Sequence, residues 1–424
     1  MRFIADLHIH SSYSRATSAE MVPEGIWQWS QLKGIAVVGT GDFTHPAWFK
    51  ELSEKLEPAG NDLFSLKEEY RPGGGVPDSC RADVFFLLSA EISCIYKKNE
   101  RTRKIHCLVF MPDLTSVARF NAALARIGNI TSDGRPILGL DARELLKITL
   151  DTSAEALFIP AHAWTPHFSV FGAASGFDSL EECFEDLTQH IYAVETGLSS
   201  DPAMNWRLSA LDRITLVSNS DAHSAPKLGR EANIFDVEVS YRAIMESIKS
   251  RRGFLGTIEF FPEEGKYHFD GHRPCGVRCS PEETRKNEYR CPVCGKRLTV
   301  GVMHRVEKLA DRAHGFTPAG APPYHSLIPL QEVLAEARGV GANSKSVADD
   351  YRSLLARLGN EFKILMETPI ADIERAASPL AAEAVARMRA GNVHIKPGYD
   401  GEYGEITILG DAGRKAVKGQ MQLL

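Results

Sequence analysis

The sequence predicts an α/β protein in which largely parallel strands form a barrel or a doubly wound sheet. The first observation is that short β-branched or aromatic runs alternate with longer helical patterns up to about residue 260. The second is a change in composition near residue 265, where cysteines occur in pairs, and the third is helical periodicity after residue 304. Because 424 residues exceed what one hydrophobic core usually serves, we expect three parts: 1–262, 263–303 and 304–424.

The composition is that of a globular protein. Hydrophobic residues make up 43% and charged residues 25%, with a formal net charge of −6, close to the average for soluble proteins. No run approaches the ~18 consecutive apolar residues that a membrane span needs, and no charged-then-apolar leader precedes Phe3. We therefore expect a cytoplasmic protein without a membrane partner.

Strands and helices are expected to alternate through the first part of the chain. The expected strands are Arg2–Ala5, Ile35–Gly39, Val84–Ser89, Ile105–Phe110, Leu157–Pro160, Ile191–Val194, Ile214–Ser218 and Phe254–Ile258. Helical patterns between them include Pro23–Leu32, Val117–Ile127, Ala142–Ile148 and Tyr241–Ser250.

Metal-ligand side chains follow strand after strand in this region. His8 and His10 follow the first strand two positions apart, so both point to the same side of an extended chain. Further imidazoles and carboxylates end or lie in later strands: Asp42, Glu91, His106, His162, Glu195, Asp221 and His223. A lone His-x-His pair is often just two surface histidines, but repetition at many strand ends is improbable by chance. Because barrel active sites lie at the carboxyl ends of strands, we expect these side chains to converge.

Imidazole and carboxylate are ligands suited to zinc, manganese or iron. So many ligands exceed the needs of one ion, and we expect two or three divalent ions bridged by a carboxylate such as Glu91 or Asp221. Ions about 4 Å apart can clamp a phosphate and generate a hydroxide nucleophile near neutral pH, as in many phosphatases and nucleases. The sequence therefore indicates a phosphoester hydrolase.

The pattern Asp6-Leu7-His8-Ile9-His10, Glu91, His106, His162 and Ser220-Asp221-Ala222-His223 resembles the polymerase and histidinol phosphatase (PHP) family of metallophosphoesterases over residues 1–260. The resemblance implies a PHP-type distorted (β/α)₇ barrel with two or three divalent ions, zinc or else manganese, iron or magnesium. It implies His8, His10, Glu91 and Asp221 as ligands of one ion, and Glu91, His106 and His162 as ligands of a second. His223 would serve a third ion, with Asp42 standing where many relatives have a histidine. Catalytic roles are expected for Asp221, Glu91 and His223.

Four clustered cysteines predict a second kind of metal site. Cys275 and Cys279 form a C-x₃-C pair, and Cys291 and Cys294 form a C-x₂-C pair. In a cytosolic chain, four thiolates at this spacing suit one structural zinc rather than disulfides. A module this small has little core, so zinc would supply much of its folding free energy.

Three loops carry basic or aromatic candidates for nucleic-acid contact. The candidates are Lys97, Lys98, Arg101 and Arg103 between Glu91 and His106, Trp164 and Phe168 after His162, and Lys396, Tyr399 and Tyr403 in the last Gly-rich turn. Cations would bind phosphates and rings would stack on bases. The alternatives are a solvated hairpin tip, a small satellite core and a turn without a ligand.

A narrower resemblance covers essentially the whole chain. The barrel pattern followed by the four-cysteine ribbon, His304-Arg305-Val306-Glu307, Gly359-Asn360-Glu361-Phe362 and Pro397-Gly398-Tyr399-Asp400-Gly401-Glu402-Tyr403-Gly404 resembles the endonuclease Q family. The resemblance implies a metal-dependent DNA-repair endonuclease that nicks 5′ of deaminated bases (uracil, hypoxanthine, xanthine) and of abasic sites. The alternatives are a PHP-type phosphatase or exonuclease, acting on small phosphomonoesters or DNA ends, and a non-catalytic DNA-binding protein. Residues 265–424 argue against the phosphatase, which has no need of them.

Overall fold

The computed structural model of the chain describes residues 1–410. Its main sheet has eight strands, in the order β16 (Tyr324–Ser326), β13 (Phe254–Glu259), β12 (Ala232–Asp236), β1 (Arg2–Asp6), β2 (Val37–Gly39), β5 (Phe85–Leu87), β4 (Phe64–Leu66) and β3 (Leu56–Pro58). A four-stranded sheet has the order β8 (Ile137–Leu138), β6 (Ser89–Lys98), β7 (Arg101–Phe110) and β9 (Leu157–Pro160). A further pair joins β10 (Ala193–Glu195) to β11 (Thr215–Val217).

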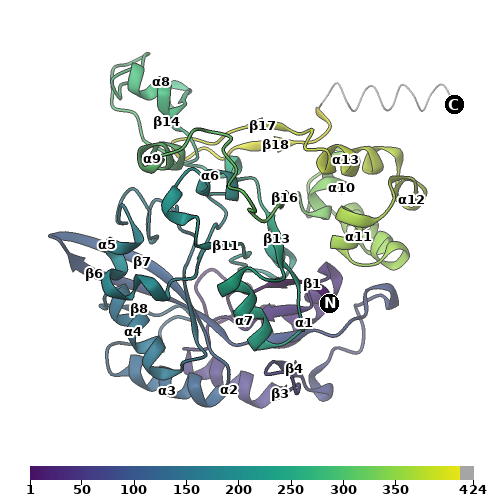
Figure 1. Cartoon of the computed structure of the whole chain (residues 1–424). Helices are drawn as coiled ribbons and strands as arrows, with labels where there is room; N and C mark the ends of the chain where they lie inside the picture. Colours follow the sequence, from purple (N-terminus) through teal and green to yellow (C-terminus); the bar gives the residue numbers. More distant parts are fainter. Residues whose placement is uncertain (411–424) are drawn as a thin grey trace, which may run out of the picture.

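Helices accompany these strands as the alternation predicts (Figure 1). They are α1 (Pro23–Lys33), α2 (Pro46–Lys55), α3 (Leu114–Ala125), α4 (Ala142–Thr152), α5 (Leu180–Phe184), α6 (Pro202–Asn205) and α7 (Tyr241–Ser250). All eight expected strands are present, and the α/β class is confirmed. The strands are not all parallel, however, because β12 runs antiparallel to β1 and β6 antiparallel to β7. The closed seven-stranded barrel stays a prediction, since the hydrogen bonds divide the strands among separate sheets.

One buried cluster nevertheless unites strands from all of these sheets. Strands β1, β2, β5, β7, β9, β10 and β11 each contribute apolar side chains to it, and α7 packs against it. Its members include Ala5, Val37, Leu87, Leu108, Ile159, Ala193 and Val217. The strands therefore surround a shared interior, and their ends bring polar side chains to a common region.

Strand β6 was not among the expected strands, since the sequence predicted a strand ending at Ser89, although a hairpin tip between Glu91 and His106 was one of the alternatives. The two strands pair over ten residues each, from Ser89 opposite Phe110 to Lys98 opposite Arg101. Its two-residue turn, Asn99-Glu100, has positive φ at both positions, 54° and 60°, which is the type I′ geometry that matches strand twist. Glu91 therefore lies within a strand, where its position is set by ladder hydrogen bonds.

The later part of the chain is rich in helices, as the periodicity after residue 304 predicts, and one further helix lies within residues 263–303. They are α8 (Pro281–Lys286), α9 (Val302–Leu309), α10 (Leu330–Arg338), α11 (Lys345–Leu358), α12 (Ile370–Ala376) and α13 (Pro379–Arg389). The hairpin of β17 (His394–Lys396) and β18 (Glu405–Thr407) extends between the α9 region and α13 (Figure 1). Among residues 1–410, no helix has both the length and the apolar character needed to cross a membrane.

A buried ion pair fastens the C-terminal helices to the first part of the chain. Lys33 Nζ lies 2.7 Å from Glu361 Oε2, and both side chains are less than 5% exposed. The Tyr351 hydroxyl donates to the same oxygen at 2.8 Å, and the backbone N–H of Leu330 donates to the other at 3.0 Å. Because Glu361 has lost its water, removal of its cation leaves an uncompensated buried charge.

We predict that Lys33→Ala lowers the free energy of unfolding by about 3–5 kcal/mol. The control is Lys50→Ala, because the Lys50–Glu54 pair is exposed and such pairs contribute about 1 kcal/mol or less. Urea denaturation followed by circular dichroism measures both. Equal transitions for the two variants would contradict a docking role for Lys33.

Candidate metal centre

The first wall of the site is the segment that follows β1. Backbone hydrogen bonds join it to the loop after β11: Asp221 N donates to His8 O at 2.9 Å, and His10 N donates to Ala222 O at 2.9 Å. Both histidine side chains are buried, at 1% and 0% exposure. His8, His10 and Asp221 are therefore held together by the main chain as well as by their side chains.

The first ligand group consists of His8, His10, Glu91 and Asp221, whose ligand atoms all lie within 4.8 Å of one another. His10 Nε2 is 3.2 Å from Glu91 Oε2 and 3.1 Å from Asp221 Oδ1. Within residues 1–410, His8 Nε2, His10 Nε2 and Asp221 Oδ1 are buried without a hydrogen-bond partner. Buried polar atoms without partners are costly, so this convergence of unpaired imidazole and carboxylate atoms fits a divalent cation.

The second group consists of Glu91, His106 and His162. Glu91 Oε1 lies 2.7 Å from His106 Nδ1 and 3.0 Å from His162 Nε2. The other oxygen, Oε2, faces His10 in the first group. The structure thus brings six predicted ligand residues into two groups that share Glu91, the carboxylate expected to bridge two ions.

Two further carboxylates orient the histidines. His8 Nδ1 lies 3.0 Å from Glu195 Oε1, and His10 Nδ1 lies 2.9 Å from Asp42 Oδ1. A proton shared on this side of each ring leaves Nε2 free to bind a metal. The sequence placed Glu195 at a strand end without including it among the site residues.

Asp42 belongs to neither ligand group, and its role at a third ion stays a prediction. Its second oxygen accepts hydrogen bonds from Ser11 N and from the hydroxyls of Ser11 and Ser14. His223 Nδ1 donates to the Asp221 carbonyl at 2.9 Å, and His223 belongs to neither ligand group. Among residues 1–410, therefore, Asp42 and His223 are not joined by a third set of ligands.

The electrostatics favour cation binding. Burial would lower the pKa of His8 and of His10, but neighbouring carboxylates, led by Glu195 and Asp42 respectively, hold both pKa values well above the usual range. Burial lowers the pKa of His106 to about 4, although Glu91 opposes the shift. Despite burial, the nearby imidazoles hold the pKa of Glu91 and of Asp221 below the usual range. The protons on His8 and His10 thus occupy a place that a divalent ion would take.

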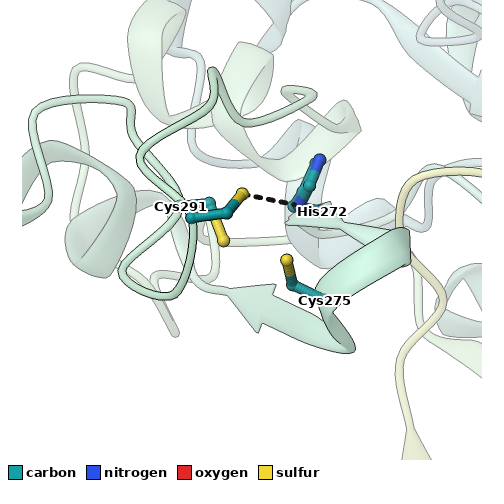
Figure 2. A group of neighbouring side chains, drawn as sticks. His272, Cys275 and Cys291 are labelled. Carbon is teal, nitrogen blue, oxygen red and sulfur yellow. Dashed lines mark hydrogen bonds between the residues drawn. The ribbon is translucent and has the colours of Figure 1, made fainter.

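The cysteine module gathers a different set from the one expected. Cys275, Cys291 and Cys294 come together with His272, all four ligand atoms lying within 4.8 Å of one another. Cys294 Sγ is 3.5 Å from His272 Nδ1, and Figure 2 shows His272, Cys275 and Cys291 around one centre. The set has two equal x₂ spacings, His272 to Cys275 and Cys291 to Cys294.

Cys279 is not one of these four residues, and the set of four cysteine ligands stays a prediction. Strands β14 (Asp270–His272) and β15 (Val277–Cys279) pair antiparallel, with His272 opposite Val277 and Cys279 opposite Asp270. Cys275 in the connecting turn is therefore near His272, whereas Cys279 is at the far end of the hairpin. There it is buried in a small cluster with Cys291 and Leu298, against which Cys275 packs.

The candidates for nucleic-acid contact separate by burial. Lys97, Arg101, Lys396 and Tyr403 are exposed, and Phe168 and Tyr399 are half-buried. Lys98 pairs with Glu185 at 2.7 Å, and Arg103 is buried over the Phe177 ring, so both have structural partners. Trp164 is fully buried and its indole N–H donates to Asn205 at 2.8 Å. The prediction that Trp164 stacks on a base is therefore wrong for this structure.

Phe168 is the aromatic residue that remains at the site. Its ring centroid lies 4.7 Å from that of His106. Lys104 Nζ lies over the Phe168 ring, 5.3 Å from its centroid. The loop also contributes backbone strain, with positive φ at His162 and Phe168. Strain of this kind clusters at functional sites.

The fold and these ligand groups define an α/β protein with a candidate binuclear metal centre. Among solved structures, the lesion-specific endonuclease PfuEndoQ of Pyrococcus furiosus has a TM-score of 0.84 and 33% identity, covering 97% of this chain and 96% of that chain. An endonuclease Q complex with a 27-mer duplex that carries an abasic lesion at the active site has a TM-score of 0.81 and 33% identity, with 96% and 97% covered. The uncharacterized protein YqxK of Bacillus subtilis is 31% identical over 96% of this chain and 99% of its own length.

A narrower match concerns the C-terminal helices. Residues 329–392 match the family model of the MJ0043 C-terminal domain. The uncharacterized protein MJ0043 of Methanocaldococcus jannaschii is itself 33% identical over 58% of this chain, and the chain spans 31% of that protein's length. Together the comparisons confirm the resemblance seen in the sequence: this chain belongs to the endonuclease Q family, whose members are DNA-cleaving hydrolases.

We predict that His272→Ala lowers the bound zinc by about one ion per chain, because it removes one of four tetrahedral ligands, whereas Cys279→Ser leaves the zinc content unchanged. Elemental analysis of the dialysed proteins measures both. If Cys279→Ser loses zinc and His272→Ala keeps it, the ligands are the four cysteines.

Proposed function

We propose that this protein is a metal-dependent DNA-repair endonuclease that nicks the phosphodiester on the 5′ side of deaminated bases (uracil, hypoxanthine, xanthine) and of abasic sites. The observation that carries the proposal is the pair of ligand groups sharing Glu91, within a chain aligned end to end with an endonuclease Q bound to lesion-bearing duplex. We also propose that the strands around the shared core form a distorted (β/α)₇ barrel over 1–262, followed by a zinc module over 263–303 and a mainly helical region from residue 304. The end of that last part, residues 411–424, lies outside the described residues.

The proposed ligands are His8, His10, Glu91 and Asp221 for one divalent ion, and Glu91, His106 and His162 for another. Ions held there would stabilise charge on a phosphate and favour deprotonation of a water nucleophile. Glu195 and Asp42 keep the ligand nitrogens aimed at the centre. His162 Nδ1 lies 3.0 Å from the Thr165 hydroxyl, which fixes that ring in the same way.

A cavity of about 370 Å³ adjoins this centre and suits an extrahelical base. Arg230 lines it and also donates to the carbonyls of Ser220 and Asp221, at 2.8 and 3.3 Å. Leu198 follows Glu195 by three residues, and Tyr267 and Tyr403 form aromatic walls from the later part of the chain. A base that leaves the stack needs such a pocket, and the aromatic walls offer stacking surfaces for it.

The donors in this cavity match the chemistry of deamination. Deamination replaces an exocyclic amino group, which donates, with a carbonyl oxygen, which accepts. Ser199, Arg230 and Lys266 line the cavity and all carry donors. They would satisfy the new carbonyl of a deaminated base, and a pocket that pairs this oxygen favours such a base over its parent.

We expect duplex DNA containing deoxyinosine, deoxyuridine or an abasic site to be nicked when zinc, manganese or magnesium is present, and to stay intact after treatment with a chelator. Asp221→Asn should lower the nicking rate by at least roughly 100-fold, because it removes a proposed ligand, while DNA binding is retained. Asp151→Asn is the matched control, since Asp151 is exposed on α4.

The assay also distinguishes the alternatives. Intact lesion duplex with every metal contradicts the proposal. Rapid hydrolysis of small phosphomonoesters without DNA binding would instead identify a phosphatase of the PHP type.

A separate prediction concerns the aromatic side chains that line the cavity. Tyr403→Ala should weaken binding of a deoxyinosine duplex by roughly tenfold, since loss of one base–aromatic stack costs about 1–3 kcal/mol. Binding of an abasic duplex should change little, because that substrate presents no base to the pocket. Equal losses on both substrates, measured by fluorescence anisotropy, would exclude Tyr403 from base contact.

A further inference from the structure

Arg135 stands at the metal centre, although no motif in the sequence marked it. Its Nη1 donates to Glu91 Oε2 at 2.9 Å, the oxygen that also faces His10. The Arg135 side chain is 30% exposed, whereas Glu91 is fully buried. One end of the guanidinium therefore contacts the shared carboxylate while the rest faces the open side of the site.

The loop that carries Arg135 is fixed at several points. Gly134 N donates to Tyr13 O at 3.0 Å, and the Thr44 hydroxyl donates to Gly134 O at 3.2 Å. Ser93 N donates to Pro136 O at 3.0 Å, which joins the loop to β6. These bonds hold both flanks of Arg135 against the elements that carry the ligands.

Gly134 shows how closely the loop approaches the site. A Cβ at this position would lie 2.3 Å from Ser14 Oγ and 2.4 Å from Asp42 Oδ2. Only glycine allows the backbone this near to the pair that orients His10. Arg135 is thus placed in advance, as electrostatic stabilisation of a reacting group requires.

The Arg135 guanidinium has N–H groups that are available to bind a ligand. Arginine carries five N–H donors, and within the part of the chain that the structure describes its hydrogen bonds go to Glu91 alone. Glu91 already contacts His10, His106 and His162. A residue needed only to neutralise Glu91 would not require a half-open position at the mouth of the site.

The balance of charges at the site also favours a phosphate contact for Arg135. Four carboxylates lie in or beside the ligand groups, the buried Glu91, Glu195 and Asp42 and the partly exposed Asp221, and they would offset two divalent ions. The charge of Arg135 then remains to match the single negative charge of a phosphodiester. Arginine is suited to this because its planar fork pairs with phosphate oxygens.

We propose that Arg135 contacts a non-bridging oxygen of the phosphodiester that is cut, while its Nη1 keeps Glu91 in place. This inference rests on the proposed endonuclease function. Arg135 would be a catalytic residue of that reaction, added to the ligands and to the orienting carboxylates.

The first test compares Arg135→Gln and Arg135→Lys with Arg143→Gln, a control in which an arginine paired with surface acids is removed. We expect Arg135→Gln to lower the single-turnover nicking rate by about 10²–10³-fold, the loss found when one preorganised donor is removed. Arg135→Lys should recover part of the rate, and all three variants should keep the metal content of the parent. Loss of bound metal in Arg135→Gln would show that Arg135 only supports Glu91, and would overturn the proposal.

The second test reads the phosphate contact without cutting. In an Asp221→Asn background, an abasic duplex is bound with either a phosphodiester or an uncharged methylphosphonate at the 5′ linkage. We expect the protein that keeps Arg135 to favour the phosphodiester by roughly tenfold more than Arg135→Gln does, as charge-assisted hydrogen bonds contribute about 1.5–3 kcal/mol. Bound ions also attract the charged linkage, but they act on both proteins alike. The same preference in both proteins overturns the contact. The proposed function is rejected by a different result, which is that the parent protein nicks none of the lesion duplexes. That result comes from the nicking assay and not from the binding measurements.

Discussion

The shared position of Glu91 is the constraint on which the rest of the site depends. Its carboxylate is buried, with one oxygen toward His8 and His10 and the other toward His106 and His162. A carboxylate can be buried only when its charge is compensated, so the histidines, Arg135 and any bound ions must all be placed correctly around it. The β6–β7 ladder does this from one side, because a one-residue slip would turn Glu91 to the opposite face.

Two further buried carboxylates, Glu195 and Asp42, orient the histidine ligands around Glu91. Glu195 accepts from His8, from the His162 backbone and from Asn219, so one buried carboxylate links three strand ends. Asp42 performs the corresponding task for His10 with the help of Ser11 and Ser14. Orientation of the ligands is therefore built from residues that themselves face away from the centre.

The sequence predicted the fold class, the positions of the strands and a convergence of strand-end ligands, because these are local patterns. The division of the ligands between two ions came from the resemblance to the PHP family. It did not identify the roles of Glu195 and Arg135, since an orienting carboxylate and a loop arginine have no spacing that distinguishes them. His272 was missed because a C-x₃-C pair suggests its own cysteines, and only the β14–β15 register separates Cys279 from Cys275. The prediction for Trp164 failed because the sequence does not show whether an aromatic ring beside a ligand is exposed or buried. In this structure the Trp164 ring is buried and its indole N–H donates to Asn205.

The later parts of the chain are joined physically to the centre. Arg305 of α9 donates to the carbonyls of Phe171 and Phe177 and so supports the loop that follows His162. Phe362 packs against Gly229, whose N–H donates to Asp6 and which directly precedes Arg230. The cavity of about 370 Å³ is lined by Arg230 and Leu198 from the first part and by Tyr267 and Tyr403 from the later parts. The ligand groups alone would fit many phosphate esters, whereas the shape that would select among them arises from the docking of these parts on the strands.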